Sequence, residues 1–377
     1  MSAKAITIND YLEFVRKTDR LPVDELTPVL HGLFGEVGGL MAAAKKLKRE
    51  PNTYTGFDQV VIEEFGDAFW YLCCLATRLD IDIKSVFLTV MKANTAEPEI
   101  LIGSENSPVS IAYKAETEIE FDEILVDLGQ LTGNFLNPEF IQEESLEKLT
   151  SFIRTFFAAL SVLNLNFSRV IEWNMKKISS RFIKPDNAEL HTFDDDFPEF
   201  ERLPEKFEIE FVQRTNSQQA MRWNGVFIGD PLTDSIKDED SYRFHDVFHF
   251  AFAVILHWSP TFRALIKHKR KSNPEIDRTQ DGGRAIVVEE GLSAWIFTIA
   301  KENKFFEGKE SLTFDMLKNV GQFVKGFEVE ACPLILWEEA ILQGYNIFRE
   351  VVKNNGGVVV GDRKKRTLTY LRCLSRE

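Results

Sequence analysis

Apolar residues in the first half of the chain recur at spacings of three and four residues, which brings them to one face of a helix. The pattern runs from residue 8 to residue 180 and is interrupted by two turn-like stretches, 51–56 and 104–108. Nothing in this region alternates apolar and polar residues as a strand would. We therefore expect the N-terminal part of the protein to be a bundle of amphipathic helices.

A short acidic segment then breaks the helical pattern. Residues 183–205 contain three prolines and the acidic run Asp194–Asp196, a composition typical of linkers. We expect the main domain boundary in this segment, with 206–377 forming a separate C-terminal domain.

The C-terminal region combines further helices with a few strand-like patterns. Residues 207–212 alternate apolar and charged positions, and 226–228 are expected to pair with them. Helical periodicity resumes over 242–353, and 358–370 are predicted to form a hairpin with a basic tip at 363–366. The predicted fold class is therefore mainly α: an all-α helical bundle, then a mostly helical domain with a small β-sheet.

Length and charge limit the function of such a protein. A chain of 377 residues with 44% hydrophobic residues can form two or three packed cores. Its formal net charge of −14 argues against nucleic-acid binding by bulk electrostatics, because that binding requires a positive surface. Small anionic substrates remain compatible with local lysines or a bound metal ion.

The cysteines and the lack of a long apolar run bear on location. The four cysteines show no spacing typical of a zinc site, so we interpret them as reduced thiols in a reducing compartment. Nowhere do 18 uncharged apolar residues run together. We therefore expect a soluble cytoplasmic protein that does not enter a membrane.

Three acidic residues in the N-terminal helices point to metal chemistry. Glu64 and Asp67 are three residues apart, so both carboxylates leave one face of a helix. Glu36 lies on the preceding helix and meets them if the two helices pack antiparallel. Converging carboxylates suit Mg²⁺, which takes oxygen ligands and keeps waters for a phosphate to displace.

Lys45 and Lys46 follow Glu36 on the same predicted helix, where they can neutralise the phosphates of a substrate bound through the metal. An ordinary alternative stays open: acidic and basic residues also decorate the solvent faces of many amphipathic helices. Spacing alone does not decide between these interpretations.

Four stretches in this region resemble the MazG-like nucleotide pyrophosphohydrolase family over about residues 8–95. They are Tyr11–Thr18, Gly35–Leu40, Glu64–Leu72 and Leu79–Ile83. The resemblance implies an all-α domain over 1–100 that uses Mg²⁺ (or Mn²⁺) and an activated water to cleave nucleoside triphosphates, NTP or dNTP, into the monophosphate and pyrophosphate. Nucleotide-pool control and phage or stress responses are roles consistent with this activity.

The resemblance also assigns residues. It implies that Glu36, Glu64 and Asp67 are metal ligands, that Glu63 orients water, and that Lys92 and Asn94 contact substrate. Trp70 can stack on a base or belong to the core, because an aromatic ring serves either purpose.

One position departs from the family pattern of ExxE followed by ExxD. Gly39 stands where the second glutamate of ExxE is expected, and the loss of a charged ligand should weaken metal binding. The alternative function is therefore a nucleotide-binding sensor whose degenerate N-terminal domain is coupled to a metal-dependent C-terminal effector domain.

Residues 118–182 align with the first copy as a degenerate second helical copy. In that register Gln130 replaces Glu36, Lys148 replaces Glu64 and Ser151 replaces Asp67, while the apolar frame is kept. We hypothesise that the second copy replaces the partner subunit of a dimer, although a homo-oligomer is not excluded. Lys148, Lys176 and Lys177 then line the cleft. Loose similarity between any two amphipathic segments is the competing explanation.

The C-terminal domain contains a second candidate metal site. His245 and His249 are four residues apart, the spacing with which two imidazoles on a helix share a metal ion, whereas the adjacent Asp246 is expected to point elsewhere. Glu289 and Glu290 are candidates to complete a second divalent metal site. Arg284 is a candidate to bind a phosphate or carboxylate. The competing interpretation is that both histidines are structural.

Overall fold

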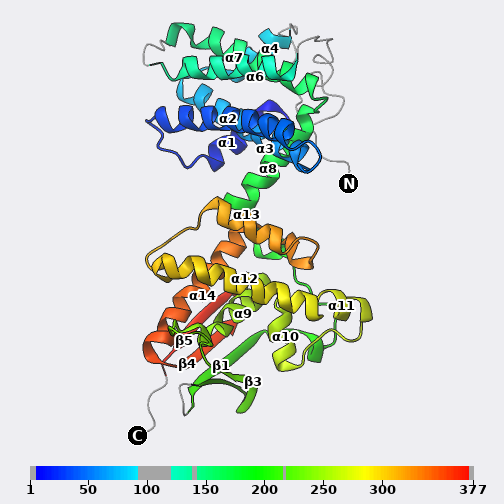
Figure 1. Cartoon of the computed structure of the whole chain (residues 1–377), viewed down its shortest axis with the longest axis vertical. Helices are drawn as coiled ribbons and strands as arrows, with labels where there is room; N and C mark the ends of the chain where they lie inside the picture. Colours follow the sequence, from blue (N-terminus) through cyan, green and yellow to red (C-terminus); the bar gives the residue numbers. More distant parts are fainter. Residues whose placement is uncertain (1–5, 92–119, 138–141, 215–217, 373–377) are drawn as a thin grey trace. The chain divides into compact units, whose positions relative to one another are not determined.

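The computed structural model describes residues 6–91, 120–137, 142–214 and 218–372. Two compact units make up the chain, Met1–Phe182 and Ile183–Glu377 (Figure 1). The predicted fold class is confirmed: the protein is mainly α, and the C-terminal unit carries a small antiparallel sheet. No helix among the described residues is long and apolar enough to cross a membrane.

The N-terminal unit is a bundle of amphipathic helices. In chain order these are α1 (Ile8–Thr18), α2 (Thr27–Arg49), α3 (Phe57–Arg78), α4 (Ile83–Met91), α6 (Phe121–Phe135), α7 (Gln142–Val162) and α8 (Phe167–Phe182). The first begins at a capping box, in which Thr7 and Asp10 satisfy each other's backbone N–H groups. Buried aromatic rings, including Phe69, Phe87, Phe156 and Phe167, fill the core in mostly edge-to-face contacts.

The same pattern of helix packing occurs twice in this unit. Helix α2 packs against α3 and α6 packs against α7, while α2 and α6 pack against each other. The last helix after each pair crosses over: α8 packs on α3, and α4 packs on α7 (Figure 1). Residues distant in sequence are thereby brought to α3.

The C-terminal unit is built on a five-stranded antiparallel sheet of order β3-β2-β1-β4-β5. The strands are β1 (Lys206–Gln213), β2 (Gln219–Trp223), β3 (Val226–Leu232), β4 (Gly357–Asp362) and β5 (Thr367–Leu371). The strand predicted at 226–228 exists as β3, but it pairs with β2 rather than with β1, because the turn at Asn224–Gly225 folds it back onto its nearest neighbour in sequence.

Helices cover this sheet. They are α9 (Asp246–Ala251), α10 (Pro260–Ile266), α11 (Pro274–Thr279), α12 (Gly283–Glu302), α13 (Phe314–Phe323) and α14 (Leu334–Asn354). Helices α9 and α14 pack against β4 and β5, and α10 packs against β3. A π-helical turn, Phe252–Leu256, continues directly from α9, a rare element that is frequent near functional sites.

Two charged segments behave differently from the sequence-based expectation. The segment 183–205 packs as part of the C-terminal unit, because buried Asp194 accepts hydrogen bonds from Arg263, Arg363 and the backbone N–H of Leu203. The predicted hairpin with its tip at 363–366 is present as β4 and β5. Its Arg363 and Arg366 are buried rather than displayed to solvent, since Asp194 and backbone carbonyls bind them.

Candidate functional site

Helices α2 and α3 pack antiparallel at close range. A Cβ atom added at Gly32 would lie 2.2 Å from the Tyr71 ring, and one added at Gly39 would lie 2.4 Å from Oε2 of Glu64. Because Gly32 faces Tyr71 and Gly39 faces Glu64, the two helices run in opposite directions. This is the antiparallel arrangement that the sequence interpretation required. Gly39 leaves the space that the Glu64 carboxylate occupies.

Glu36 meets Glu64 across this helix pair. Burial, a hydrogen bond with Glu64 and the charge of nearby Asp67 raise the pKa of Glu36 to about 9. A proton shared between the two glutamates relieves the repulsion between their negative charges, and a bound cation would relieve the same repulsion. The two helices therefore hold a crowded group of carboxylates at the edge of the core.

Helix α8 adds the counter-charge. The ammonium of Lys177 donates to Asp67 and lies 3.0 Å from Oε1 of Glu63, and Asn174 donates to Oδ1 of Asp67 at 2.9 Å. Burial raises the pKa of Asp67, although Lys177 opposes that shift. All three charged side chains are about 14–16% exposed. Asp67 is thus fixed by two groups from α8.

The same contact extends to α1. Asn174 accepts a 2.7 Å hydrogen bond from the Tyr11 hydroxyl, so it bridges α1 and Asp67. Gly66 allows this approach, since a Cβ atom there would lie 2.8 Å from the Cβ of Asn174. Asn174 was not singled out from the sequence. The signal available was its spacing of three from Lys177, which puts both on one face of a helix.

The predicted substrate-binding residues separate into three groups. Lys45 and Lys46 are exposed, and Nζ of Lys46 lies 4.4 Å from the centre of the Tyr54 ring. Tyr54 is close enough to the acids that burial and the charge of Glu64 raise its pKa. Trp70 is buried, and its indole N–H donates to Thr18, which favours the core alternative of the two that the sequence left open. Lys92 and Asn94 lie outside the described residues.

Tyr71 is a further site residue that sequence reasoning missed. Burial, followed by the charges of Glu36 and Asp67, raises the pKa of its hydroxyl to about 12. It lies four residues after Asp67 and seven after Glu64 on α3, so it shares their helix face. That spacing was readable from the sequence.

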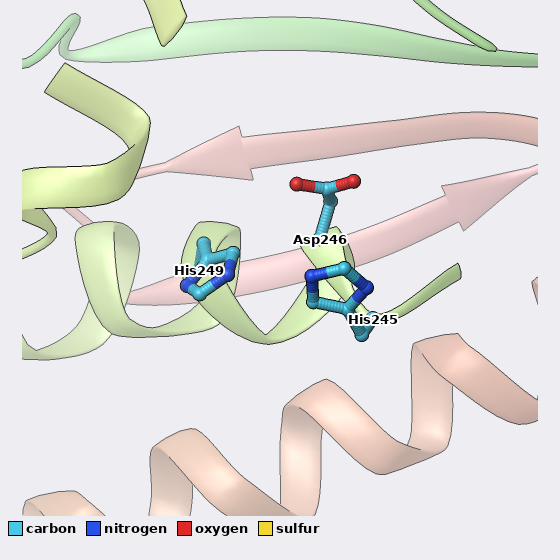
Figure 2. A group of neighbouring side chains, drawn as sticks. All are labelled: His245, Asp246 and His249. Atoms are coloured by element: carbon cyan, nitrogen blue, oxygen red, sulfur yellow. The ribbon is translucent and has the colours of Figure 1, made fainter. Parts of the chain in front are cut away.

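The C-terminal unit brings His245, Asp246 and His249 together. Potential ligand atoms of these three side chains lie within 4.8 Å of one another, and Figure 2 shows them at the start of α9. Asp246 was expected to point away from the histidines, and in Figure 2 its carboxylate leaves α9 in a different direction from the two rings, yet one of its oxygens lies within 4.8 Å of a ring nitrogen of each histidine. The aspartate therefore joins the group.

Helix α12 completes this cluster with two carboxylates. Glu289 is fully buried; it accepts from Nδ1 of His249 at 2.8 Å, from the Ser259 hydroxyl at 2.6 Å and from the backbone N–H of Thr261 at 2.9 Å. Glu290 faces the other nitrogens, with Oε1 3.3 Å from Nε2 of His249 and Oε2 3.5 Å from Nε2 of His245. Both predicted glutamates thus reach the histidines.

Arg284 does not join them. It is exposed in the first turn of α12, five residues before Glu289. Two of the arginines that are buried in this unit, Arg263 and Arg270, pair instead with Asp194 and Asp281. They hold the segments around the sheet together.

One of the comparisons with known proteins finds a similarity, and it lies in the C-terminal unit. Residues 188–373 match the family model described as the MazG C-terminal domain. The match lies in the unit that sequence analysis left unassigned, whereas the resemblance described above rests on the N-terminal helices. No curated protein and no solved structure was found to match the chain.

Proposed function

We propose, because residues 188–373 match the family model of MazG C-terminal domains, that this chain is a nucleotide pyrophosphohydrolase whose active site lies in its N-terminal unit. The proposed reaction hydrolyses an NTP or dNTP between the α and β phosphates and releases the monophosphate and pyrophosphate. One observation carries the proposal: Glu36, Glu64 and Asp67 gather on the facing sides of α2 and α3. Nucleotide-pool control is a role consistent with it.

The residues fit a hard divalent cation such as Mg²⁺ or Mn²⁺. Every donor in the group is a carboxylate oxygen, and the crowding of Glu36 against Glu64 leaves negative charge that Lys177 balances only in part. Glu36, Glu64 and Asp67 would hold the ion. When bound, Mg²⁺ supplies charge stabilisation for the phosphoryl oxygens and lowers the pKa of a water.

The surrounding side chains orient this group. Lys177 and Asn174 hold the Asp67 carboxylate in one position, so that its geometry does not depend on the substrate. Glu63, held by the same ammonium, is the candidate to orient the attacking water. Lys46, lying over Tyr54 near Glu64, is placed to meet the phosphates from the solvent side.

The helix pairing supports the tandem-copy hypothesis. In this hypothesis α2 corresponds to α6, α3 to α7 and α4 to α8. The contact between α3 and α8 then has its counterpart in the contact between α7 and α4, and α2 and α6 contact each other as equivalent helices. This is the pattern of a two-fold dimer joined into one chain. We propose that the second copy, without the acids, serves as the built-in partner of the first.

Release of pyrophosphate and monophosphate from a panel of NTPs and dNTPs, with Mg²⁺ or Mn²⁺, tests the proposed activity. Glu64→Gln should abolish turnover, because it removes a ligand charge while keeping the side-chain size. Asp58→Asn is the matched control, since Asp58 is exposed on the same helix. Equal activity of Glu64→Gln and wild type would contradict the assignment of the site.

One observation favours a second function, a nucleotide-binding sensor. Gly39 removes one acid from the family pattern, and Glu64 occupies the vacated space, so metal affinity can support binding without turnover. The C-terminal unit is then the metal-dependent effector. Nucleotide-dependent thermal stabilisation in the absence of any pyrophosphate release would favour this function.

A further inference from the structure

We propose that the C-terminal unit contains a divalent transition-metal site, formed by His245, Asp246 and His249 of the α9 region and Glu290 of α12. This site is separate from the Mg²⁺ site proposed in the N-terminal unit and does not depend on it. Its ligand class is the borderline first-row ions, with Zn²⁺ as the reference.

The hydrogen bonds of the two histidines leave the same nitrogen available on each. Nδ1 of His245 lies 2.9 Å from the carbonyl oxygen of Tyr242, which can only accept, so that nitrogen carries the proton. Nδ1 of His249 likewise donates to Glu289. In the neutral imidazole, which is the form that binds a metal, the lone pair of each ring therefore lies on Nε2.

These lone pairs face another acceptor. Nε2 of His249 and Nε2 of His245 both lie opposite the Glu290 carboxylate, at 3.3 and 3.5 Å. Among the described residues, Nε2 of His249 and Oδ2 of Asp246 are buried without a hydrogen-bond partner, and their side chains are 0% and 5% exposed. Buried polar atoms in this state are costly, and a cation between them satisfies all of them at once.

The separations suit a tetrahedral ion. Two ligands bound at about 2.0–2.1 Å to a tetrahedral centre lie about 3.3 Å apart. The two distances between Glu290 and the imidazoles match this ligand-to-ligand edge. Asp246 supplies the fourth ligand, within 4.8 Å of both histidines.

The charge and the supporting contacts agree with a bound cation. Asp246, Glu289 and Glu290 together bring three carboxylates to the two imidazoles. Glu289 is held by Ser259 and the Thr261 backbone, and it orients His249 through Nδ1. A carboxylate behind a ligating histidine is the usual support of a protein metal ligand.

The donor set selects the ion. Two imidazole nitrogens favour zinc, manganese, iron, cobalt or nickel over Mg²⁺ and Ca²⁺, which prefer oxygen alone. Four protein ligands leave no open position, as in structural sites. The bound ion therefore ties α9 to α12 across forty residues of sequence.

Metal binding to the full-length chain tests the proposal. After chelator treatment, the protein is titrated without nucleotide with Zn²⁺, with Co²⁺ and with Mg²⁺, and bound metal, Co²⁺ absorption and Tm are measured. We expect one tight Zn²⁺ or Co²⁺ per chain, a tetrahedral Co²⁺ spectrum and a raised Tm. His245→Gln and Glu290→Gln should each weaken Zn²⁺ binding at least ~10-fold, and Mg²⁺ should not compete.

Matched variants separate this site from other binding. His268→Gln and the exposed Glu302→Gln should leave Zn²⁺ affinity unchanged, and so should Glu64→Gln in the N-terminal unit. Glu290 is 38% exposed, so Glu290→Gln remains informative if His245→Gln fails to fold. Loss of tight Zn²⁺ binding in Glu64→Gln, or unchanged affinity in both ligand variants, would overturn the proposal and leave the cluster as a buried hydrogen-bond network.

Discussion

The two units gather acidic side chains in different ways. In the N-terminal unit, carboxylates from α2 and α3 meet an ammonium from α8, and every candidate ligand is an oxygen. In the C-terminal unit, carboxylates from α9 and α12 meet two imidazoles, and one of these is fully buried. The helix that carries Glu36 in the former site also carries the exposed Lys45 and Lys46, whereas in the latter site only Glu290 is substantially exposed.

This contrast separates two uses of a metal ion. Oxygen ligands beside an ammonium suit an ion that exchanges waters for phosphate. Nitrogen ligands with a fixed carboxylate behind them suit an ion that stays in place. We therefore expect catalysis and metal-dependent stability to reside in different halves of one chain.

The largest expected effect separates the two sites directly. Asp67→Asn removes a charge from the proposed catalytic group and weakens its pairing with Lys177. Turnover should fall at least ~100-fold, the scale of losing a charge-stabilising group at a reacting centre, while Zn²⁺ retention is unchanged. Parallel assays of pyrophosphate release and metal content check this; a simultaneous loss of Zn²⁺ would merge the two sites into one.

A smaller effect is expected from the cation that supports Asp67. Lys177→Met leaves Asp67 and Glu63 partly buried without their counter-charge, so activity should fall about 10-fold and the free energy of unfolding by about 1–3 kcal/mol. Lys176→Met is the control, because Lys176 is exposed on the same helix. Chemical denaturation and initial-rate measurements report both quantities. Similar behaviour of the two variants would mean that Lys177 is only a surface charge.

Acid sensitivity should be stronger in the C-terminal unit, where His257 is buried. Burial, with the nearby charges of Arg363 and Arg366, lowers the pKa of His257 from 6.5 to about 3. Below pH 6.5 the unfolded chain therefore binds a proton that the folded chain does not, and this contribution to stability is lost as the pH falls.

The variant His257→Asn isolates that contribution, and asparagine tolerates the positive φ of 57° at this position. Relative to wild type, its free energy of unfolding should improve by up to ~1.4 kcal/mol for each pH unit between about 6.5 and 4. Urea unfolding at several pH values measures the difference. A difference that does not vary with pH would show that His257 is not buried in its neutral form.

The smallest effect comes from two adjacent glycines. Gly38→Ala should stabilise α2 by about 0.5–1 kcal/mol, because alanine favours a helix over glycine, whereas Gly39→Ala should gain less because its Cβ displaces the Glu64 carboxylate. Only the second meets Glu64, at 2.4 Å, whereas the first meets nothing within 4 Å. Activity should therefore fall several-fold in Gly39→Ala alone, as initial rates will show. Equal rates would mean that Glu64 need not occupy that space.

Local spacing made part of the N-terminal site predictable. The interval of three between Glu64 and Asp67 placed both on one face of α3, and the short connection to α2 made an antiparallel pair with Glu36 the natural arrangement. The same reasoning left Trp70 undecided, because its period on the helix fits the core and a ligand pocket equally well. Burial against Thr18 settled its packing role only in three dimensions.

Contacts between distant segments were harder to predict. Asn174 reaches Asp67 from 107 residues away, and no periodicity within α8 indicates which helix it will face. The burial of Arg363 depends on Asp194, 169 residues earlier, in a segment that its composition assigned to a linker. Each outcome depends on tertiary packing.

The contact between Asp67 and Lys177 joins an early and a late part of the first unit, which matters while the chain is being synthesised. Their separation of 110 residues means that the acidic group of a growing chain leaves the ribosome well before the lysine does. Since synthesis proceeds from the N-terminus, the nascent protein holds its acids without their ammonium until α8 has folded back. The proposed activity would therefore have to wait until the whole first unit has been translated.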